Sequence, residues 1–190
     1  MSTRREKIVE TAKDLFYKNG YRATGIDQIL AEAGVSKPTM YKYFRSKDEL
    51  IIASLKLWDT EFRTRLDKFM DDFSGSAHDR FLHLFEFLKS WFESPEFNGC
   101  MYISASVEYS DHNNSINQLA REQKESLTSY IEKLLKDSSV MDSDSVAKQI
   151  SMVVEGAVTT AHLVGSSDAA AEAKSIASLI INSRANSVAA

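Results

Sequence analysis

Residues 24–47 read TGIDQILAEAGVSKPTMYKYFRSK, and the pattern of this stretch predicts two short helices. Its apolar residues recur at the spacing of one helical face and predict a helix over 26–33. Gly34 follows, and glycine accepts the left-handed backbone conformation that often ends a helix. The pair Gly34-Val35 therefore predicts a tight turn, after which a second short helix is expected over 36–44.

Both short helices begin at residues suited to capping. Thr24 is expected to be the N-cap of the first helix, with Asp27 supplying an acid in its first turn. Ser36 is expected to cap the second helix, and Pro38 lies in its first turn, where a missing N–H costs little.

Two short helices joined by a tight turn predict a helix-turn-helix, whose second helix enters the major groove of DNA. Val35 and Met40 are expected to face inward and to fix the crossing of the two helices. The side chains left around the exposed side are Lys37, Thr39, Tyr41, Lys42 and Tyr43. They offer ammonium groups for phosphates, a hydroxyl for hydrogen bonding and apolar contact for a thymine methyl group.

Helical spacing extends over the rest of the chain, which predicts an all-α fold. A β-rich chain of this length would need more turn-forming residues than two prolines and seven glycines. The expected helices cover 3–19, 26–33, 36–44, 46–72, 77–93, 100–109, 115–136, 142–164 and 168–184, with a capping box formed by Ser46 and Glu49. We expect a three-helix DNA-binding head over 1–48 and a six-helix body for ligand binding and dimerisation over 49–190.

Charge is distributed unevenly along the chain. Residues 1–48 carry ten basic and six acidic side chains, whereas the remainder carries thirteen basic and twenty-one acidic ones. A positive segment joined to a negative one indicates that the first meets a polyanion. No apolar run approaches the roughly 18 residues of a membrane span, and no signal peptide is evident. The single cysteine fits a reducing compartment, so we expect a cytoplasmic protein without a membrane partner.

Residues 16–50, FYKNGYRATGIDQILAEAGVSKPTMYKYFRSKDEL, resemble the DNA-binding domain of the TetR family of bacterial repressors. The resemblance covers the first 50–60 residues and rests on the order Gly-Tyr, Thr, Ile, Ala-Gly-Val-Ser, Tyr, Tyr-Phe, Ser-Lys, Glu-Leu. Two positions depart from the family pattern. Gly25 replaces the usual Ser or Thr and is expected to weaken the start of its helix, while Pro38 replaces a frequent glycine.

The resemblance implies which residues touch DNA. They are the positions matching Thr24, Lys37, Thr39, Tyr41, Lys42 and Tyr43, and Lys47 matches a lysine that touches a phosphate. Ser36 and Pro38 belong to the same expected surface. The alternative for the lysines is a solvated surface, and for Tyr41 and Phe44 it is a place in the core.

One head covers about half of an operator, so a palindromic DNA operator and a homodimer are expected. Helices 142–164 and 168–184 mix small and aliphatic residues, which lets helices approach closely. The resemblance implies that these two helices form a four-helix bundle with their copies. The alternative is that their apolar faces are internal core.

The middle of the body is rich in aromatic residues, which suits a small-molecule pocket. The expected pocket residues are Phe62, Phe85, Trp91, Met101, Ser104, Glu108, Met152, Glu155 and Thr159. The resemblance implies that a bound effector shifts the fourth helix, spreads the two heads and releases the repressor. The alternative is a well-packed core without a ligand.

Cys100 begins a short helix after Gly99, an arrangement that resembles a subset of TetR regulators. Some members of that subset sense electrophiles or oxidants through a cysteine. A thiol at a helix N-terminus is more readily ionised than usual. The alternative is that Cys100 is a small buried hydrophobic residue.

An enzyme is not expected. The four histidines are scattered and match no metal-binding spacing, and the chain has neither a phosphate-binding glycine loop nor a nucleophile elbow. The sequence therefore predicts no metal, no cofactor and no catalytic residues. The remaining rival is a helical interaction protein that does not bind DNA.

Overall fold

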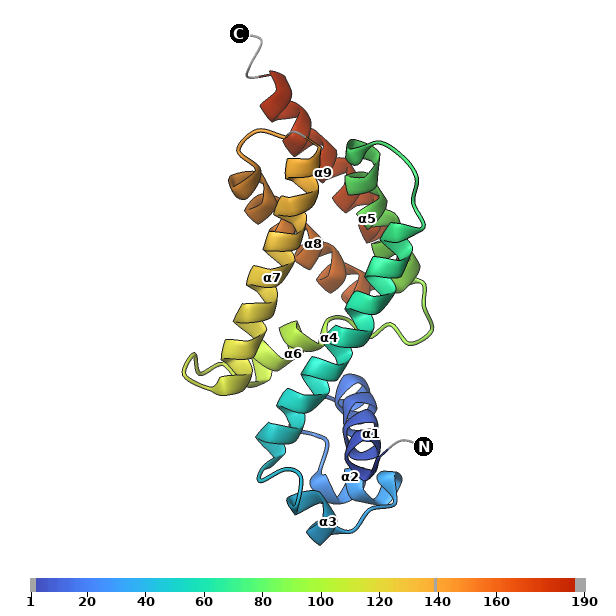
Figure 1. The fold of residues 1–190 in the computed structure, drawn as a ribbon, viewed down its shortest axis with the longest axis vertical. Helices are drawn as coiled ribbons and strands as arrows, with labels where there is room; N and C mark the ends of the chain where they lie inside the picture. Colours follow the sequence, from blue (N-terminus) through green and yellow to red (C-terminus); the bar gives the residue numbers. More distant parts are fainter. Residues whose placement is uncertain (1–2, 139, 187–190) are drawn as a thin grey trace. The chain divides into compact units, whose positions relative to one another are not determined.

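The computed structural model describes residues 3–138 and 140–186, and these residues form nine helices and no strand (Figure 1). The helices are α1 (Arg4–Asn19), α2 (Ile26–Ala33), α3 (Lys37–Tyr41), α4 (Lys47–Asp71), α5 (Ala77–Phe92), α6 (Met101–Glu108), α7 (Ser115–Asp137), α8 (Ser143–Val164) and α9 (Asp168–Asn186). The all-α prediction is confirmed.

The chain divides into two compact units. The first, here the head unit, comprises Met1–Thr64 and Met101–Arg121, and the second, the body unit, comprises Arg65–Cys100 and Glu122–Ala190. Helix α6 therefore belongs to the same compact unit as α1, α2 and α3, although it begins 60 or more positions after each of them ends. The functional boundary expected at residue 48 stays a prediction.

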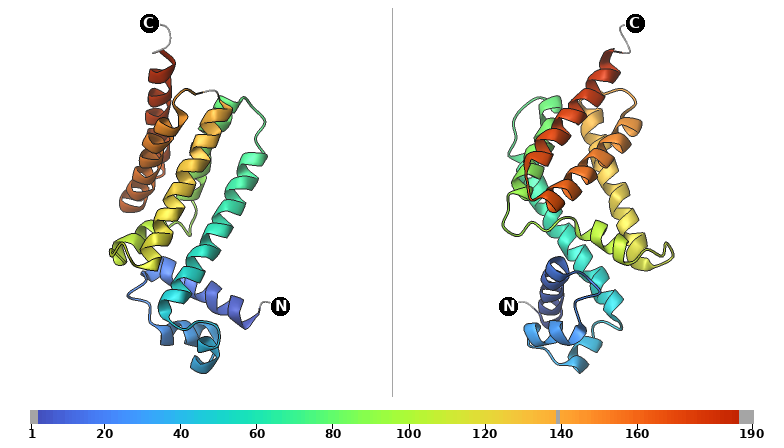
Figure 2. Two further views of the ribbon diagram at one scale, coloured as in Figure 1. Left: turned by 60° about the vertical axis from the view of Figure 1, so that its left-hand side comes forward. Right: turned by 180° about the vertical axis from the view of Figure 1, so that it is seen from behind.

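The head unit is built on the amphipathic helix α1. Thr3 and Glu6 form a reciprocal capping box at its N-terminus. Its apolar face supplies fully buried side chains, which join others from α2, α3 and α4 in one core: Ile8, Ala12, Phe16, Ile29, Met40 and Leu50. Helix α2 contacts both α1 and α3 (Figure 2).

The body unit contains a helical pair, α8 and α9, packed on α5 (Figure 2). Small residues line the buried side of the pair and let the two backbones approach closely: Ala157, Ala161, Ala170, Ala173 and Ala177. Helix α5 contributes buried aromatic side chains, among them Phe81 and Phe85. Gly165 adopts a left-handed conformation that ends α8 before the chain turns into α9.

Three local predictions need correction. Helix α3 ends at Tyr41 and not at residue 44, because the N–H of Tyr43 bonds to the Met40 carbonyl and tightens the last turn. The N-cap of α2 is Gly25 and not Thr24, whose hydroxyl donates backward to the Gly20 carbonyl. At the start of α4, Ser46 caps as expected, but Glu49 accepts from the N–H of Arg45.

None of the helices within residues 3–138 and 140–186 combines the length and the apolar content that crossing a membrane requires.

Candidate nucleic-acid interface

The turn between α2 and α3 is set by Gly34. Its φ of 63° and ψ of 39° lie in the left-handed region, where a side chain would be strained. The N–H of Val35 donates to the Leu30 carbonyl over 3.1 Å, which satisfies one of the carbonyls left open at the end of α2. The chain therefore turns within three residues and starts α3 beside α2.

Met40 of α3 and Phe44, three residues after the end of α3, hold the helix against the core. Both side chains are buried, and the guanidinium carbon of Arg5 lies 5.2 Å from the centre of the Phe44 ring. These contacts fix which side of α3 is turned away from the core. The expectation that Met40 faces inward is confirmed, and Phe44 is a core residue.

The outer side of α3 and of the turn that follows it is polar and aromatic. Tyr41 and Tyr43 are 49% and 44% exposed, so neither is a core residue. Lys37 and Lys42 are exposed beside them, and Thr39 is half-buried. Two neighbouring exposed aromatic side chains beside exposed lysines give this face the character of a binding surface.

Three of the expected contact residues already have polar partners. The ammonium group of Lys37 lies 2.9 Å from Asp27, and this hydrogen bond raises the pKa of Lys37 above its ordinary value. The hydroxyl groups of Ser36 and Thr39 lie 2.8 Å apart. These side chains are therefore oriented before any DNA arrives.

Lys47, at the start of α4, is half-buried. Partial burial lowers its pKa, whereas the nearby carboxylates of Glu108 and Asp48 oppose that shift. Desolvation disfavours the charged form, so an incoming phosphate would restore some of the stabilisation that water no longer gives.

Thr24 differs from its expected role. Its side chain is fully buried, and its hydroxyl lies within hydrogen-bonding distance of the carbonyls of Gly20, at 2.7 Å, and Leu15, at 3.3 Å. It holds the loop between α1 and α2 and is not presented at the surface, so we leave it out of the proposed DNA contacts.

A contact that the sequence did not predict holds the same loop from α6. The carboxylate of Glu108 accepts the backbone N–H groups of Tyr21, over 2.8 Å, and Arg22, over 2.7 Å. No local pattern signals this contact, because 87 positions separate Tyr21 from Glu108.

The residues expected to line an effector pocket belong to both units. The head unit contains Phe62, Met101, Ser104 and Glu108, and the body unit contains Phe85, Trp91, Met152, Glu155 and Thr159. Phe85, Trp91 and Met101 are buried, whereas Met152 and Thr159 are exposed on α8. Glu155 forms an ion pair with Lys124 of α7. The pocket stays a prediction.

Cys100 is half-buried and directly precedes α6. The neighbouring Gly99 has a φ of 78°, and a Cβ placed on it would lie 3.2 Å from the ring of His162. The short segment before Cys100 is thus closely packed against α8 within the body unit.

Comparison with known proteins agrees with this geometry. Residues 8–53 match the family described as bacterial regulatory proteins of the tetR family, and residues 77–177 match the tetracyclin repressor-like C-terminal domain. The regulator YjdC of Escherichia coli is 24% identical over 155 residues, which cover 82% of this chain and 81% of YjdC. The repressor NemR of E. coli is 28% identical over 108 residues, 56% of this chain and 54% of NemR.

Solved structures share the fold over nearly the whole chain. A TetR-family transcriptional regulator from Streptomyces coelicolor superposes with a TM-score of 0.87 at 24% identity, covering 95% of both chains. The reduced form of E. coli NemR superposes with a TM-score of 0.83 at 22% identity, covering 94% of this chain and 96% of NemR.

A helix-turn-helix with an exposed second helix, on a chain that continues as a helical body, defines a transcriptional regulator that binds DNA. This chain belongs to the TetR family of bacterial regulatory proteins. Its relatives named above are regulators of transcription.

Proposed function

We propose that this regulator is a cytoplasmic repressor that reads a palindromic operator as a homodimer and leaves it when a small molecule binds. The observation that carries the proposal is the outer side of α3, where Tyr41, Lys42 and Tyr43 are exposed while Met40 is buried. The proposed DNA contacts are Ser36, Lys37, Pro38, Thr39, Tyr41, Lys42, Tyr43 and Lys47.

The test is a fluorescence anisotropy titration with a labelled duplex from the promoter beside the protein's own gene. Lys42→Ala should weaken binding and reduce the slope of log K against log salt by about 1, because one phosphate contact is lost. Tyr41→Ala should weaken binding by about 1–3 kcal/mol if it contacts a base. Lys133→Ala on α7, an exposed lysine of the body unit, is the matched control. Unchanged affinity in both α3 variants would contradict these contacts.

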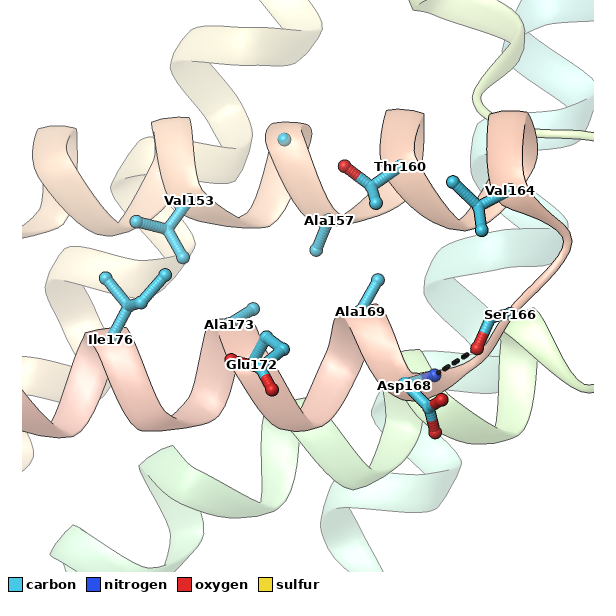
Figure 3. A pocket seen from close by; sticks show the side chains of 11 residues that line it. Val153, Ala157, Thr160, Val164, Ser166, Asp168, Ala169, Glu172, Ala173 and Ile176 are labelled. Carbon is cyan, nitrogen blue, oxygen red and sulfur yellow. Dashed lines mark hydrogen bonds between the residues drawn. The ribbon is translucent and has the colours of Figure 1, made fainter.

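Dimerisation is proposed to use the face formed by α8 and α9. A groove of about 420 Å³ runs between the two helices and is lined mostly by small and apolar side chains, including Val153, Ala157 and Ile176 (Figure 3). Ile176 and Val164 are 45% and 67% exposed at this groove. Burying such side chains against a second copy would be favourable.

The effector is proposed to be a small molecule. A thermal-shift screen against metabolite pools tests this, since a ligand that binds only the folded chain raises Tm. The same ligand should weaken the binding of the promoter duplex, and a ligand that raises Tm without affecting DNA affinity would argue against release.

A second candidate is sensing of electrophiles through Cys100. Two observations favour it: the thiol is half-buried, and it directly precedes Met101, whose carbonyl is bonded to the head residue Tyr21. N-ethylmaleimide tests the proposal, because the thiolate adds to its carbon–carbon double bond and the adjacent carbon takes a proton from water. Complete labelling should release the promoter duplex, and Cys100→Ser should be insensitive. Retention of the duplex after complete labelling would end this candidate.

A further inference from the structure

The loop between α1 and α2 is attached to both ends of α6. At the C-terminal end, the two carboxylate oxygens of Glu108 each accept one backbone N–H, from Tyr21 and Arg22. At the N-terminal end, the buried hydroxyl of Tyr21 donates to the Met101 carbonyl over 2.9 Å. All of these residues lie in the head unit. The loop is therefore held at two points on one helix.

The backbone at Gly20 leaves room for the carboxylate of Glu108. Gly20 has a φ of 85°, and a Cβ placed on it would lie 3.0 Å from the nearer carboxylate oxygen of Glu108. Glycine both adopts this backbone conformation and leaves the space that the carboxylate occupies.

Tyr109, next to Glu108, packs on the same loop residues. Its ring stands edge-on to Tyr21 with the ring centres 6.3 Å apart, and the guanidinium carbon of Arg22 lies 5.8 Å from the ring centre. Glu108 thus contacts the backbone of Tyr21 and Arg22, and Tyr109 contacts the side chains of the same two residues.

The position of this loop determines where α2 begins. Gly25 is the N-cap of α2 and provides no side-chain cap, so the helix start depends on what holds the preceding residues. Thr24 is bonded to the loop itself, at Gly20, whereas Glu108 ties the backbone of two loop residues to α6. Since α2 contacts α3, a shift of the loop would move the DNA-reading face.

We propose that Glu108 is a positioning residue for DNA recognition, acting through the backbone of Tyr21 and Arg22 to set the placement of α2 and α3. The inference rests on the proposed function, because its effect is read in the affinity for DNA. It concerns a residue that is not among the proposed DNA contacts and was expected in the effector pocket.

The test variant is Glu108→Gln, which keeps the shape of the side chain. Its amide group replaces one acceptor oxygen, so an N–H of the loop would face another donor and one bond would be lost. We expect the Kd for the promoter duplex to rise about tenfold, the effect of losing one hydrogen bond to a charged group. The Kd is measured well below the Tm of each variant, where both chains are folded. A loss of overall stability alone would then leave the Kd unchanged.

Glu86→Gln is the matched control. It makes the same chemical change at a carboxylate paired with Lys174 in the body unit. Its Kd should stay within about twofold of the unmodified chain, consistent with the small contribution of exposed ion pairs.

Tyr21→Phe tests the other attachment by removing only a hydroxyl group. It should also weaken DNA binding, and the double variant should lose less than the two single losses combined, because both contacts hold one loop. Amide hydrogen exchange at Tyr21 and Arg22 provides a measurement without DNA, and Glu108→Gln should speed it.

The outcomes separate the two proposals. If the unmodified chain binds the duplex and both single variants bind equally well, the positioning role of Glu108 is wrong while the proposed function stands. Unchanged exchange at the two amides overturns the positioning role regardless of DNA. A chain that binds no duplex overturns the proposed function and this inference with it.

Discussion

The ammonium group of Lys37 on α3 lies 2.9 Å from the carboxylate of Asp27 on α2, and both side chains are exposed. The pair links the two helices of the helix-turn-helix at the surface proposed to face DNA. A phosphate would have to compete with Asp27 for this ammonium group, and the carboxylate itself would repel the phosphate.

Replacing Asp27 by asparagine should therefore strengthen DNA binding. We expect the Kd for the promoter duplex to fall about threefold at low salt, with a smaller gain at high salt because exposed charges are screened. The free energy of unfolding should change by less than about 1 kcal/mol, since exposed ion pairs contribute little. Asp144→Asn, an exposed acid near Lys148 on α8, is the control. Weaker binding by Asp27→Asn would show that Asp27 orients Lys37 productively.

Gly20→Ala should destabilise the chain. The φ of 85° and ψ of 166° at Gly20 belong to a region that is essentially restricted to glycine, and strain there costs about 1–3 kcal/mol. The new methyl group would also press on Glu108. Urea unfolding measures the change. Gly25→Ser is the comparison, because Gly25 has an ordinary φ and open space around it, and it should differ by only a few tenths of a kcal/mol.

Tyr130 should ionise late in an ultraviolet titration, well above the ordinary tyrosine pKa of about 10. Burial raises its pKa to about 12, nearby Asp67 and Asp71 act in the same direction, and Arg80 opposes them. Because the folded chain favours the neutral phenol, the associated stability is present below about pH 10 and is lost as the pH rises towards 12.

Tyr130→Phe should reduce the amplitude of the late part of that titration by the contribution of one tyrosine. The loss of stability above about pH 10 should also become shallower in the variant. A wild-type curve that is complete near pH 10, with no late component, would contradict the assignment.

Ile176→Glu should separate the proposed dimer. Ile176 lines the groove between α8 and α9, and a carboxylate there would be buried without a partner against a second copy. Sedimentation velocity at micromolar concentration should show a monomer, and DNA affinity should fall with it. Met141→Glu places the same charge at an exposed apolar residue just before α8 and should sediment like the unmodified chain. If the Ile176→Glu chain is still a dimer, the interface does not lie at this groove.

Local patterns were sufficient to predict most of the helices. The bounds of α2 agree with the predicted range, and α5, α7, α8 and α9 agree to within about two residues at each end. Their periodic apolar faces, caps and terminating glycines act over a few residues, so the information lies within each segment. The predicted end of α3 was wrong because the chain tightens at the Met40 carbonyl and buries Phe44 in the core, and helical spacing does not express such packing.

The site was predictable where it depends on α3 alone. The exposed positions of Lys37, Tyr41 and Lys42 follow from the inward placement of Met40, which the spacing predicted. Thr24 and Glu108 were not predictable in the same way. Thr24 was interpreted as a cap from its immediate neighbours, whereas its hydroxyl is bonded to residues that precede it. Glu108 depends on a contact across 87 positions.

Helix α3 spans only Lys37–Tyr41, and so short a helix is not stable by itself in water. Its shape depends on Met40, on the left-handed Gly34 and on the core beneath, none of which provides a side chain to the proposed DNA surface. The exposed side chains of α3 consequently contribute little to the free energy of folding. Descendants of this gene can exchange them, and so acquire new operators, without first accumulating compensating mutations in the core.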